Sequence, residues 1–375
     1  MRIGIYTLPL HCNYGGLLQA WALQMVLRQM GHDVVTFNLD QYEHLPWMQM
    51  PFIYANRITK RLLGRPVEIR REKRRNRERN MIMQNLKPFI DSNIRTKVFR
   101  DVNELSSKDY DVLISGSDQV WRPQYNETFS QTIENAFLEF AQNWKVRRIA
   151  YAASFGTDEW EFTEEQTARC SNLVRKFQAV SVREQSAIRM CKEYLGVQAV
   201  QTLDPTFLLH RTDYEVLIED GLPTKAPTGD MLCCILDSTE EKDLLIKRIA
   251  QSKGLTPFRG HSRVFDKYVG LEERIQPSVE QWLRNFRDAS FVVTDSFHAC
   301  VFSIIFGKPF VVIGNEDRGM ARYMSLFAML SLENHLVRSA KDYDPHCSYD
   351  VGDGVNSKLD LLKSSSMKFL CDALN

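Results

Sequence analysis

Residues 291–313 read FVVTDSFHACVFSIIFGKPFVVI, and this stretch indicates the fold class of the chain. The apolar run at its start predicts a buried strand, and a polar turn then leads into an apolar helix that Gly307 ends. A second apolar run, after Pro309, predicts another buried strand. A strand, a helix and a strand in this order form the repeating unit of a parallel sheet covered by helices.

The same alternation begins at the N-terminus. Residues 2–8 predict a strand, residues 17–30 a helix and residues 33–38 the next strand. Gly15 and Gly16 close the first turn, as is typical of the opening unit of a doubly wound sheet. Further strands are expected at 110–115, 148–153, 179–182, 197–202 and 231–236, and further helices at 129–142, 163–177 and 184–195.

A turn-rich region at 205–230 divides this series in two. We therefore expect an α/β protein with two Rossmann-like domains facing across a cleft, one at residues 1–210 and the other at 211–375. Residues 50–90 fit neither series, and we expect them to form a basic helical insertion in the first domain.

The charge of the chain is balanced overall but not locally. The 375 residues include 48 Lys and Arg against 47 Asp and Glu, so the net charge of +1 gives no reason to expect nucleic-acid binding. Residues 57–79, however, contain eleven basic and three acidic residues, so this segment carries +8 and the remaining chain −7. Such a segment is most often a solvated helix face, but it would also suit an anionic membrane surface.

Cysteine spacing and hydropathy favour a cytoplasmic protein. None of the eight cysteines belongs to a C-x-x-C pair, so neither a disulfide framework nor a zinc knuckle is expected. The longest apolar stretch, residues 297–314, is interrupted by polar and charged residues and falls short of a bilayer-spanning helix. We expect no metal and no cofactor. Membrane contact through residues 57–79 is an open alternative to a freely diffusing protein.

Polar residues follow the predicted strands at the edge where parallel sheets bind ligands. Asn13, Gly15 and Gly16 follow the first strand, where backbone N–H groups at a helix start attract an anion. Their spacing is not the dinucleotide pattern G-x-G-x-x-G, and a tight turn without a ligand explains them equally well. Asp118 and Trp121 follow a later strand and suit a sugar, with the carboxylate bonding hydroxyl groups and an exposed indole stacking on the ring. A helix cap at Asp118 is the alternative.

Cationic residues gather at the same edge. His298 starts the helix after its strand, where it could act as an acid or base, unless it is a core histidine bonded to a carbonyl group. Arg183 leaves another strand and could clamp a carboxylate or phosphate, although pairing with a local carboxylate is the simpler interpretation. Arg318 and Arg322 stand at positions i and i+4, so they would share one face if this segment is helical. Together these residues predict a pocket for a small, doubly charged anion.

Five motifs in order resemble those of the polysaccharide pyruvyl transferase family. They are LPLHCNYGGLLQA at residues 8–20, GSDQVW at 116–121, VRE at 182–184, DPTFL at 204–208 and TDSFH at 294–298. The resemblance implies a GT-B-like fold, phosphoenolpyruvate as donor, and a sugar of a surface polysaccharide or of its lipid-linked precursor as acceptor. The reaction would form a pyruvate ketal and release phosphate.

The resemblance also implies roles for single residues. Arg183 matches the family's donor-binding arginine, and His298 matches the histidine of its R-L-H motif and would be the general acid. Ser296 stands where that motif has its arginine, so Arg318 or Arg322 would supply the missing charge to the donor. The donor would lie on the second domain, and the acceptor would contact residues of the first: Asn13, Gly15, Gly16, Asp118 and Trp121.

Two other functions remain open. A nucleotide-sugar glycosyltransferase on the same scaffold would need a carboxylate to bind ribose, and Glu316 or Asp317 could serve. A non-catalytic protein that binds anionic surfaces or RNA would use the basic segment, although that segment has few aromatic residues for base stacking.

Overall fold

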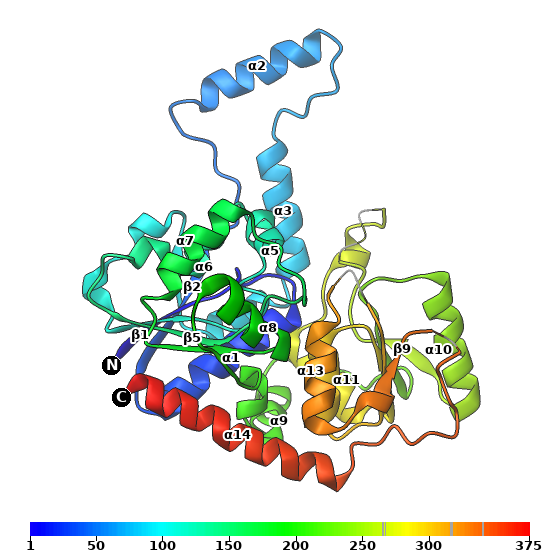
Figure 1. Ribbon diagram of the computed structural model, residues 1–375. Helices are drawn as coiled ribbons and strands as arrows, with labels where there is room; N and C mark the ends of the chain where they lie inside the picture. The colour runs from blue at the N-terminus through cyan, green and yellow to red at the C-terminus, as the bar shows by residue number, and fades with distance from the viewer. Residues whose placement is uncertain (265, 267, 316–317, 340) are drawn as a thin grey trace.

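Parallel sheets form the frame of the molecule. The computed structural model describes residues 1–264, 266, 268–315, 318–339 and 341–375, and two parallel sheets lie within this described part (Figure 1). The first has the order β3-β2-β1-β4-β5-β6-β7, and the second the order β12-β11-β10-β8-β9. The strands of the first are β1 (Arg2–Tyr6), β2 (Asp33–Leu39), β3 (Thr96–Phe99), β4 (Val112–Ser115), β5 (Arg147–Ala153), β6 (Ala179–Val182) and β7 (Val200–Gln201).

The second sheet contains the stretch from which the fold was inferred. Its strands are β8 (Met231–Cys234), β9 (Pro257–Arg259), β10 (Phe291–Thr294), β11 (Phe310–Ile313) and β12 (Leu336–Val337). β10 pairs with β11 in parallel, and the helix between them is α12 (Phe297–Ile305). The expected α/β fold with two Rossmann-like domains is confirmed.

Strands β3, β9 and β12 were not expected from the sequence. Each is short, lies at the edge of its sheet and has one buried residue: Phe99, Phe258 and Val337. An edge strand that buries so little leaves almost no apolar run to detect.

The helices mostly match the expected ones. The main ones are α1 (Tyr14–Gln29), α7 (Glu164–Val174), α8 (Gln185–Met190), α9 (Arg211–Asp220), α10 (Glu240–Lys253), α11 (Val279–Asp288) and α13 (Ala321–Leu330). The single helix expected at 129–142 is wrong, because Ser130 and Leu138 have φ values of 56° and 60°, which end helical turns. That region instead forms α5 (Pro123–Thr128), α6 (Ile133–Ala136) and a 3₁₀ turn at Glu139–Ala141.

The C-terminal helix α14 (Asp353–Leu374) returns to the first sheet, as the red helix of Figure 1 shows. The hydroxyl of Ser366 accepts a 3.0 Å hydrogen bond from the backbone N–H of Leu203, and Arg147 donates to the carbonyl of Ala373 at 2.9 Å. A division at residue 210 therefore assigns this helix to the second domain, whereas its contacts connect it to both: Lys358 near its start donates to Ser331 of the second domain.

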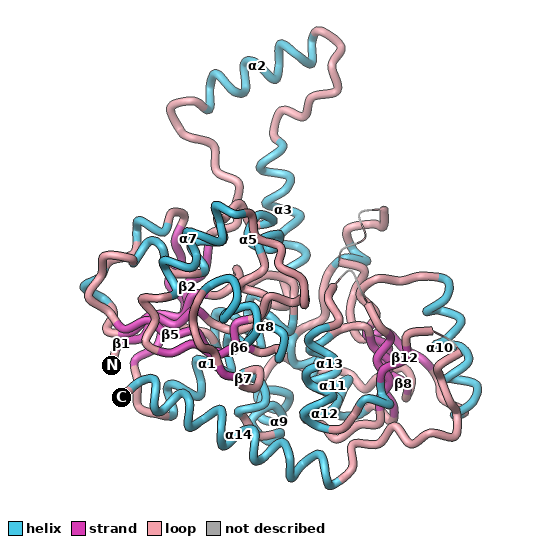
Figure 2. The backbone as a smooth tube through the Cα atoms, in the orientation of Figure 1, coloured by secondary structure: helices cyan, strands magenta, loops and turns pink. Residues whose placement is uncertain are grey.

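The basic segment lies on helices that leave the body of the molecule. Residues 50–93 form α2 (Met50–Leu62), α3 (Arg71–Met83) and α4 (Lys87–Asn93). α3 extends away from the first sheet, and α2 lies across its far end (Figures 1 and 2). Within the described residues, no helix is both long enough and apolar enough to cross a bilayer.

An aromatic joint holds the two sheets together. Tyr214 of α9 packs on Trp21 of α1 and on Phe302 of α12, with ring centroids 5.5 and 5.0 Å apart. Trp282 of α11 packs on the same Phe302 at 5.1 Å and stacks on Tyr14 at 5.0 Å. Because α1 and α12 are both anchored in this joint, their N-terminal ends are brought together.

Candidate functional site

The site forms where the strand order of each sheet reverses. In the first sheet β1 lies between β2 and β4, and in the second β8 lies between β9 and β10. The loops after such neighbouring strands diverge in opposite directions and leave a crevice, the usual ligand position of open parallel sheets. The four loops that follow β1, β4, β8 and β10 supply most of the residues of the site.

The starts of α1 and α12 meet at Gly15 and His298. A β-carbon on Gly15 would lie 2.0 Å from Nδ1 of His298, so only glycine leaves space for the imidazole ring. Asn13 caps α1 by accepting a 3.1 Å hydrogen bond from the N–H of Gly15, and Ser296 caps α12 by accepting one from Ala299 at 3.5 Å. The structure therefore brings Asn13, Gly15, Ser296 and His298 together from both domains.

His298 faces a buried carboxylate. Its Nε2 lies 3.4 Å from Oδ2 of Asp204, and its side chain is almost completely buried. The same carboxylate accepts a 2.6 Å hydrogen bond from Arg183 and a 2.7 Å bond from the hydroxyl of Thr206. Burial alone would raise the pKa of Asp204, but the positive charges of His298 and Arg183 lower it below its usual value. Asp204 is therefore an anion that lies beside the imidazole ring.

Arg183 lies behind this pair. Besides Asp204, its guanidinium lies 3.7 Å from Asp118 and 3.6 Å from Glu184, and all four side chains are buried. Burial lowers the pKa of Arg183, but these carboxylates outweigh it and raise the pKa. Arg183 is thus paired with local carboxylates, the simpler interpretation of its position, and its charge acts on Asp204.

Arg322 has weaker compensation, because among the described residues no carboxylate lies within ion-pair distance and Asp118 acts on it only from farther away. It is 6% exposed, its Nη2 donates to the carbonyl of Arg318 at 2.6 Å, and it has no carboxylate partner among the described residues. Burial lowers the pKa of Arg322. Its guanidinium lies 5.3 Å from the ring centroid of Phe297, and that of Arg183 lies 4.6 Å from it. A buried arginine without a carboxylate is a strong candidate for binding an anion.

Arg318 is oriented by a carboxylate of the second sheet. It donates to both oxygens of Asp237, at 2.5 and 2.9 Å. The expectation that Arg318 and Arg322 share a helix face is wrong, because α13 begins only at Ala321. Both side chains nevertheless line the same cavity.

This cavity has a volume of about 160 Å³ and contains much of the expected site. Its lining includes the expected residues Asn13, Asp118, Ser296, His298, Arg318 and Arg322. Behind His298 lies a narrower hollow of about 50 Å³, which Gly15 lines. Neither Arg183 nor Gly16 lines these cavities within the described part of the chain.

Trp121 is not part of the cavity wall, and its expected role as an exposed sugar platform is wrong. The indole is fully buried, stacks on Phe137 with centroids 4.5 Å apart, and donates to the hydroxyl of Ser115 at 3.1 Å. The large apolar ring is used to fill the core beneath the strand ends.

Asp118 of the same motif does reach the site, with unusual backbone geometry. Its φ is 68°, a left-handed conformation that costs energy for a residue other than glycine. It does not cap the next helix, because the cap position of α5 is Arg122. The conformation directs the Asp118 carboxylate toward Arg183 and the cavity.

Several residues of the site had not been expected. Asp204 was named only within the motif at residues 204–208 and given no role, although its position after β7, at the ligand-binding edge, could have indicated one. His11 and Phe129 line the cavity with ring centroids 5.1 Å apart. Burial lowers the pKa of His11 to about 4, so this histidine is neutral near pH 7. Tyr125 also lines the cavity.

A larger groove adjoins the cavity along α3. It has a volume of about 430 Å³, and His11 and Phe129 line both spaces. Arg79 of α3 bonds the amide oxygen of Gln41, and Arg274 bonds the carbonyl of Val264 at 3.3 Å. Neither arginine has a carboxylate partner among the described residues, so the groove wall is available to an anionic group.

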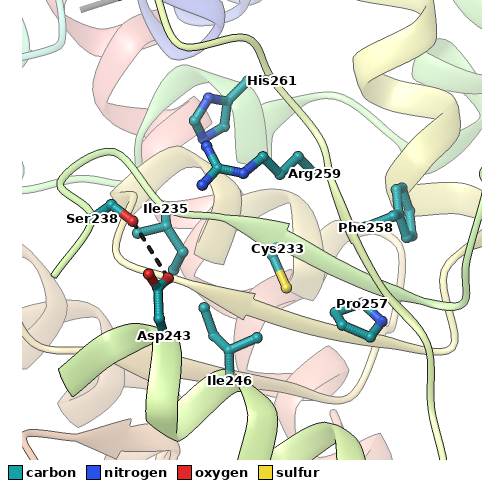
Figure 3. A pocket seen from close by; sticks show the side chains of 9 residues that line it. All are labelled: Cys233, Ile235, Ser238, Asp243, Ile246, Pro257, Phe258, Arg259 and His261. Atoms are coloured by element: carbon teal, nitrogen blue, oxygen red, sulfur yellow. Dashed lines mark hydrogen bonds between the residues drawn. The ribbon is translucent and has the colours of Figure 1, made fainter. Parts of the chain in front are cut away.

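A separate pocket of about 220 Å³ lies on the second domain, beside β8 and β9 (Figure 3). Figure 3 shows Arg259 and His261 close together on one side of it, and Asp243, which accepts a 3.4 Å hydrogen bond from Ser238, on the other. His261 also lines the hollow behind His298, so this pocket borders the site. Glu316 and Asp317, considered for ribose binding, lie outside the described residues.

Comparisons with known proteins complete the description. No curated protein matches the chain in sequence. Among solved structures, it is similar to UDP-N-acetylglucosamine 2-epimerase from Rickettsia bellii, at 9% identity and a TM-score of 0.48 over 99% of this chain and 96% of that chain. It is also similar to sucrose-phosphate synthase from Thermosynechococcus elongatus, at 10% identity and a TM-score of 0.48 over 99% and 98%.

A family model matches most of the chain. The model described as polysaccharide pyruvyl transferase matches residues 13–317. This range starts at Asn13 and includes both Asp204 and His298, of which only His298 lines the cavity. The chain therefore belongs to the polysaccharide pyruvyl transferase family, a class of enzymes.

Proposed function

We propose that the protein transfers the enolpyruvyl unit of phosphoenolpyruvate to a sugar of a surface polysaccharide or of its lipid-linked precursor. The product is a pyruvate ketal, and phosphate is released. The observation that carries this proposal is the cavity in which Arg322, which has no carboxylate partner among the described residues, lies beside the His298–Asp204 pair. In this arrangement the arginine can bind a small anion, and the histidine can donate a proton to one of its carbon atoms.

Arg322 and Arg318 bind the anionic ends of the donor in this scheme. Phosphoenolpyruvate carries a carboxylate and a phosphate, and planar guanidinium groups recognise both with paired hydrogen bonds. Arg318 provides part of the charge while its contact with Asp237 fixes its orientation. The position of Ser296, where the family motif has an arginine, is compatible with this assignment because Ser296 caps α12 beside Arg322 in the cavity lining.

His298 supplies the proton that starts the reaction. Its imidazolium protonates the methylene carbon of the enol, which leaves a cationic centre at the carbon that bears the carboxylate and the phosphate. One sugar hydroxyl attacks that carbon and loses its proton, and the bond to phosphate then breaks. A second hydroxyl attacks, also loses its proton, and closes the ketal. Asp204 favours the protonated imidazole before the transfer, and general acid catalysis of this kind contributes about 10²–10⁴-fold.

The acceptor enters through the groove along α3. His11 and Phe129 form the boundary between groove and cavity, where an aromatic ring can pack on a sugar. Asp118 accepts hydrogen bonds from sugar hydroxyls. Arg79 and Arg274 face the part of the acceptor that remains in the groove, and they suit the phosphate groups of a lipid-linked precursor.

The test is phosphate release from phosphoenolpyruvate with a panel of saccharides that carry neighbouring hydroxyl groups. The wild-type protein should release phosphate with at least one of them, and His298→Ala should lower the rate by at least 100-fold. Full activity of His298→Ala would contradict the assigned role.

The pocket of Figure 3 supports a second candidate, a nucleotide-sugar glycosyltransferase. Its Asp243 and Arg259 could contact a ribose and a phosphate. Thermal stabilisation by UDP or GDP, with none by phosphoenolpyruvate, would favour this function over the first.

A further inference from the structure

The insertion of the first domain ends in a projecting arm, which we define as residues 47–70. It contains α2, which lies at the far end of α3 in Figures 1 and 2. Every residue of α2 is described, and none of them is buried. A helix of this length is marginal in water without tertiary packing, so its surface is expected to pack on something outside the folded body.

The outward surface of the arm is apolar. Trp47, Phe52, Leu62 and Leu63 expose 79, 76, 82 and 74% of their surface. Ile58 lies one turn before Leu62 and is also exposed. Soluble proteins seldom gather so many exposed apolar side chains, and where they do, the surface binds a partner or a membrane.

An ion pair fixes which side of α2 faces outward. Arg57 donates to both oxygens of Glu72 on α3, at 2.8 and 2.5 Å, and to the carbonyl of Ile69 at 3.0 Å. Glu72 is buried, and the neighbouring guanidinium lowers its pKa to about 2. The side of α2 that carries Arg57 is therefore held toward α3, and the side that carries Ile58 and Leu62 is left to the solvent.

The charge around the apolar surface is positive and mostly uncompensated. The three acidic residues of segment 57–79 are already engaged, Glu72 with Arg57, and both Glu68 and Glu78 with Arg74. Seven other cations of the segment have no ion-pair partner in the part of the chain that the structure describes: Lys60, Arg61, Arg65, Arg70, Lys73, Arg77 and Arg79.

We propose that this arm docks on an anionic lipid surface. The apolar side chains enter the boundary between headgroups and acyl chains, and the uncompensated cations bind lipid phosphates. Helices that lie in a membrane interface combine a Trp, Phe and Leu surface with Lys and Arg residues in this way. Charge complementarity selects lipid over a second copy of the chain, because two arms placed face to face would bring their cations together.

Docking would also orient the enzyme. α3 carries the arm at one end, and its residues Arg75 and Arg79 line the groove that adjoins the cavity. A docked arm therefore places the groove on the membrane side of the molecule. The docking itself does not depend on the identity of the donor or acceptor, so it can be tested without activity.

Vesicle flotation tests the proposal with full-length protein. Vesicles of phosphatidylcholine with phosphatidylglycerol should carry the wild-type protein, whereas pure phosphatidylcholine vesicles should carry at least tenfold less. The charge variant Lys60→Gln/Arg61→Gln/Arg65→Gln/Arg70→Gln and the apolar variant Leu62→Ser/Leu63→Ser should each reduce binding at least tenfold. Because α2 buries no side chain, both variants should unfold at the wild-type temperature.

Matched variants on the body control for charge and hydropathy. Lys145→Gln/Lys192→Gln/Lys225→Gln/Lys247→Gln makes the same change of charge, and Leu244→Ser/Leu361→Ser replaces two exposed leucines. Both should bind vesicles as the wild type does. Absence of wild-type binding, or equal binding by the arm variants, would overturn the proposal. The proposal would also be overturned if the wild-type protein formed a dimer and bound no vesicles, and the apolar variant were monomeric. That result would identify a second copy of the chain as the partner.

Discussion

Nε2 of His298 lies 3.4 Å from Oδ2 of Asp204, although the two residues follow strands of different sheets. The same oxygen accepts a hydrogen bond from Arg183 at 2.6 Å. The pair exists only because α1, α9, α11 and α12 hold the domains together through their aromatic side chains. The candidate site therefore belongs to neither domain alone, and changes at this pair should affect both chemistry and stability.

Asp204→Asn keeps the shape of the side chain and removes its charge. We expect at least tenfold slower phosphate release, because the protonated form of His298 loses its anion. Unfolding free energy should fall by about 3 kcal/mol at pH 7, as is typical when one partner of a buried ion pair is removed. Since the pKa of Asp204 is lowered by folding, its stabilisation is present above about pH 4, the ordinary pKa of aspartate, and is lost on further acidification. The difference between variant and wild type should therefore narrow below that pH.

Thr206→Val is the matched control for Asp204→Asn. It removes the 2.7 Å hydrogen bond to Oδ1 of Asp204 and leaves the carboxylate charged. Chemical denaturation should show a loss of about 1 kcal/mol, with activity close to the wild type. If Thr206→Val and Asp204→Asn reduced activity equally, the charge of Asp204 would not be the relevant property.

Gly15 and Gly16 offer a second matched pair. A β-carbon at Gly15 would overlap Nδ1 of His298 at 2.0 Å, whereas one at Gly16 would meet its nearest neighbour, an oxygen of Asp118, at an ordinary 3.7 Å. Gly15→Ala should therefore displace the imidazole and abolish phosphate release. Gly16→Ala should fold with wild-type stability and leave the histidine NMR signals unchanged. If the histidine NMR signals shifted in Gly16→Ala but stayed at their wild-type positions in Gly15→Ala, the contact between Gly15 and His298 would be contradicted.

His335 should make the protein sensitive to mild acid. It is buried beneath β11, its Nδ1 donates to the carbonyl of Phe310 at 2.9 Å, and burial lowers its pKa to about 4. The unfolded chain binds a proton at this residue below about pH 6.5 and the folded chain does not, so stability falls as the pH falls from about 6.5 to 4. The unfolding free energy, measured by denaturation at several pH values in this range, should change less with pH in His335→Asn than in the wild type. An equal pH dependence in the two proteins would exclude His335 as the cause.

Trp121 and Phe129 should respond differently to truncation. Trp121→Ala should cost about 3–5 kcal/mol of stability, because it empties a fully buried site. Phe129→Ala should change stability little and raise the KM for the acceptor several-fold, since this ring lines both the cavity and the groove. Unfolding experiments and steady-state kinetics check both variants. A large loss of stability in Phe129→Ala, with a raised acceptor KM in Trp121→Ala, would contradict the roles given to the two rings.

The buried strands and their helices could be predicted because each buries a run of apolar residues, as β10, α12 and β11 show. The short edge strands could not, because β9 has a single buried side chain. His298 and Arg322 were proposed from their position after strands and Ser296 from the family resemblance, and all three line the same cavity. Trp121 was misinterpreted because a sequence does not show whether an aromatic residue at a strand end points into the core. The role of Asp204 was missed because its partner His298 is 94 residues away in the sequence and lies beside it only in the folded protein.

Direct binding of phosphoenolpyruvate tests the central claim. Calorimetric titration should show binding to the wild-type protein and to Arg28→Gln, a matched change at an exposed arginine of α1. Arg322→Gln should bind at least tenfold more weakly, because it removes the buried cation that lacks a carboxylate partner among the described residues. Equal binding of phosphoenolpyruvate by Arg322→Gln and the wild type would contradict the account.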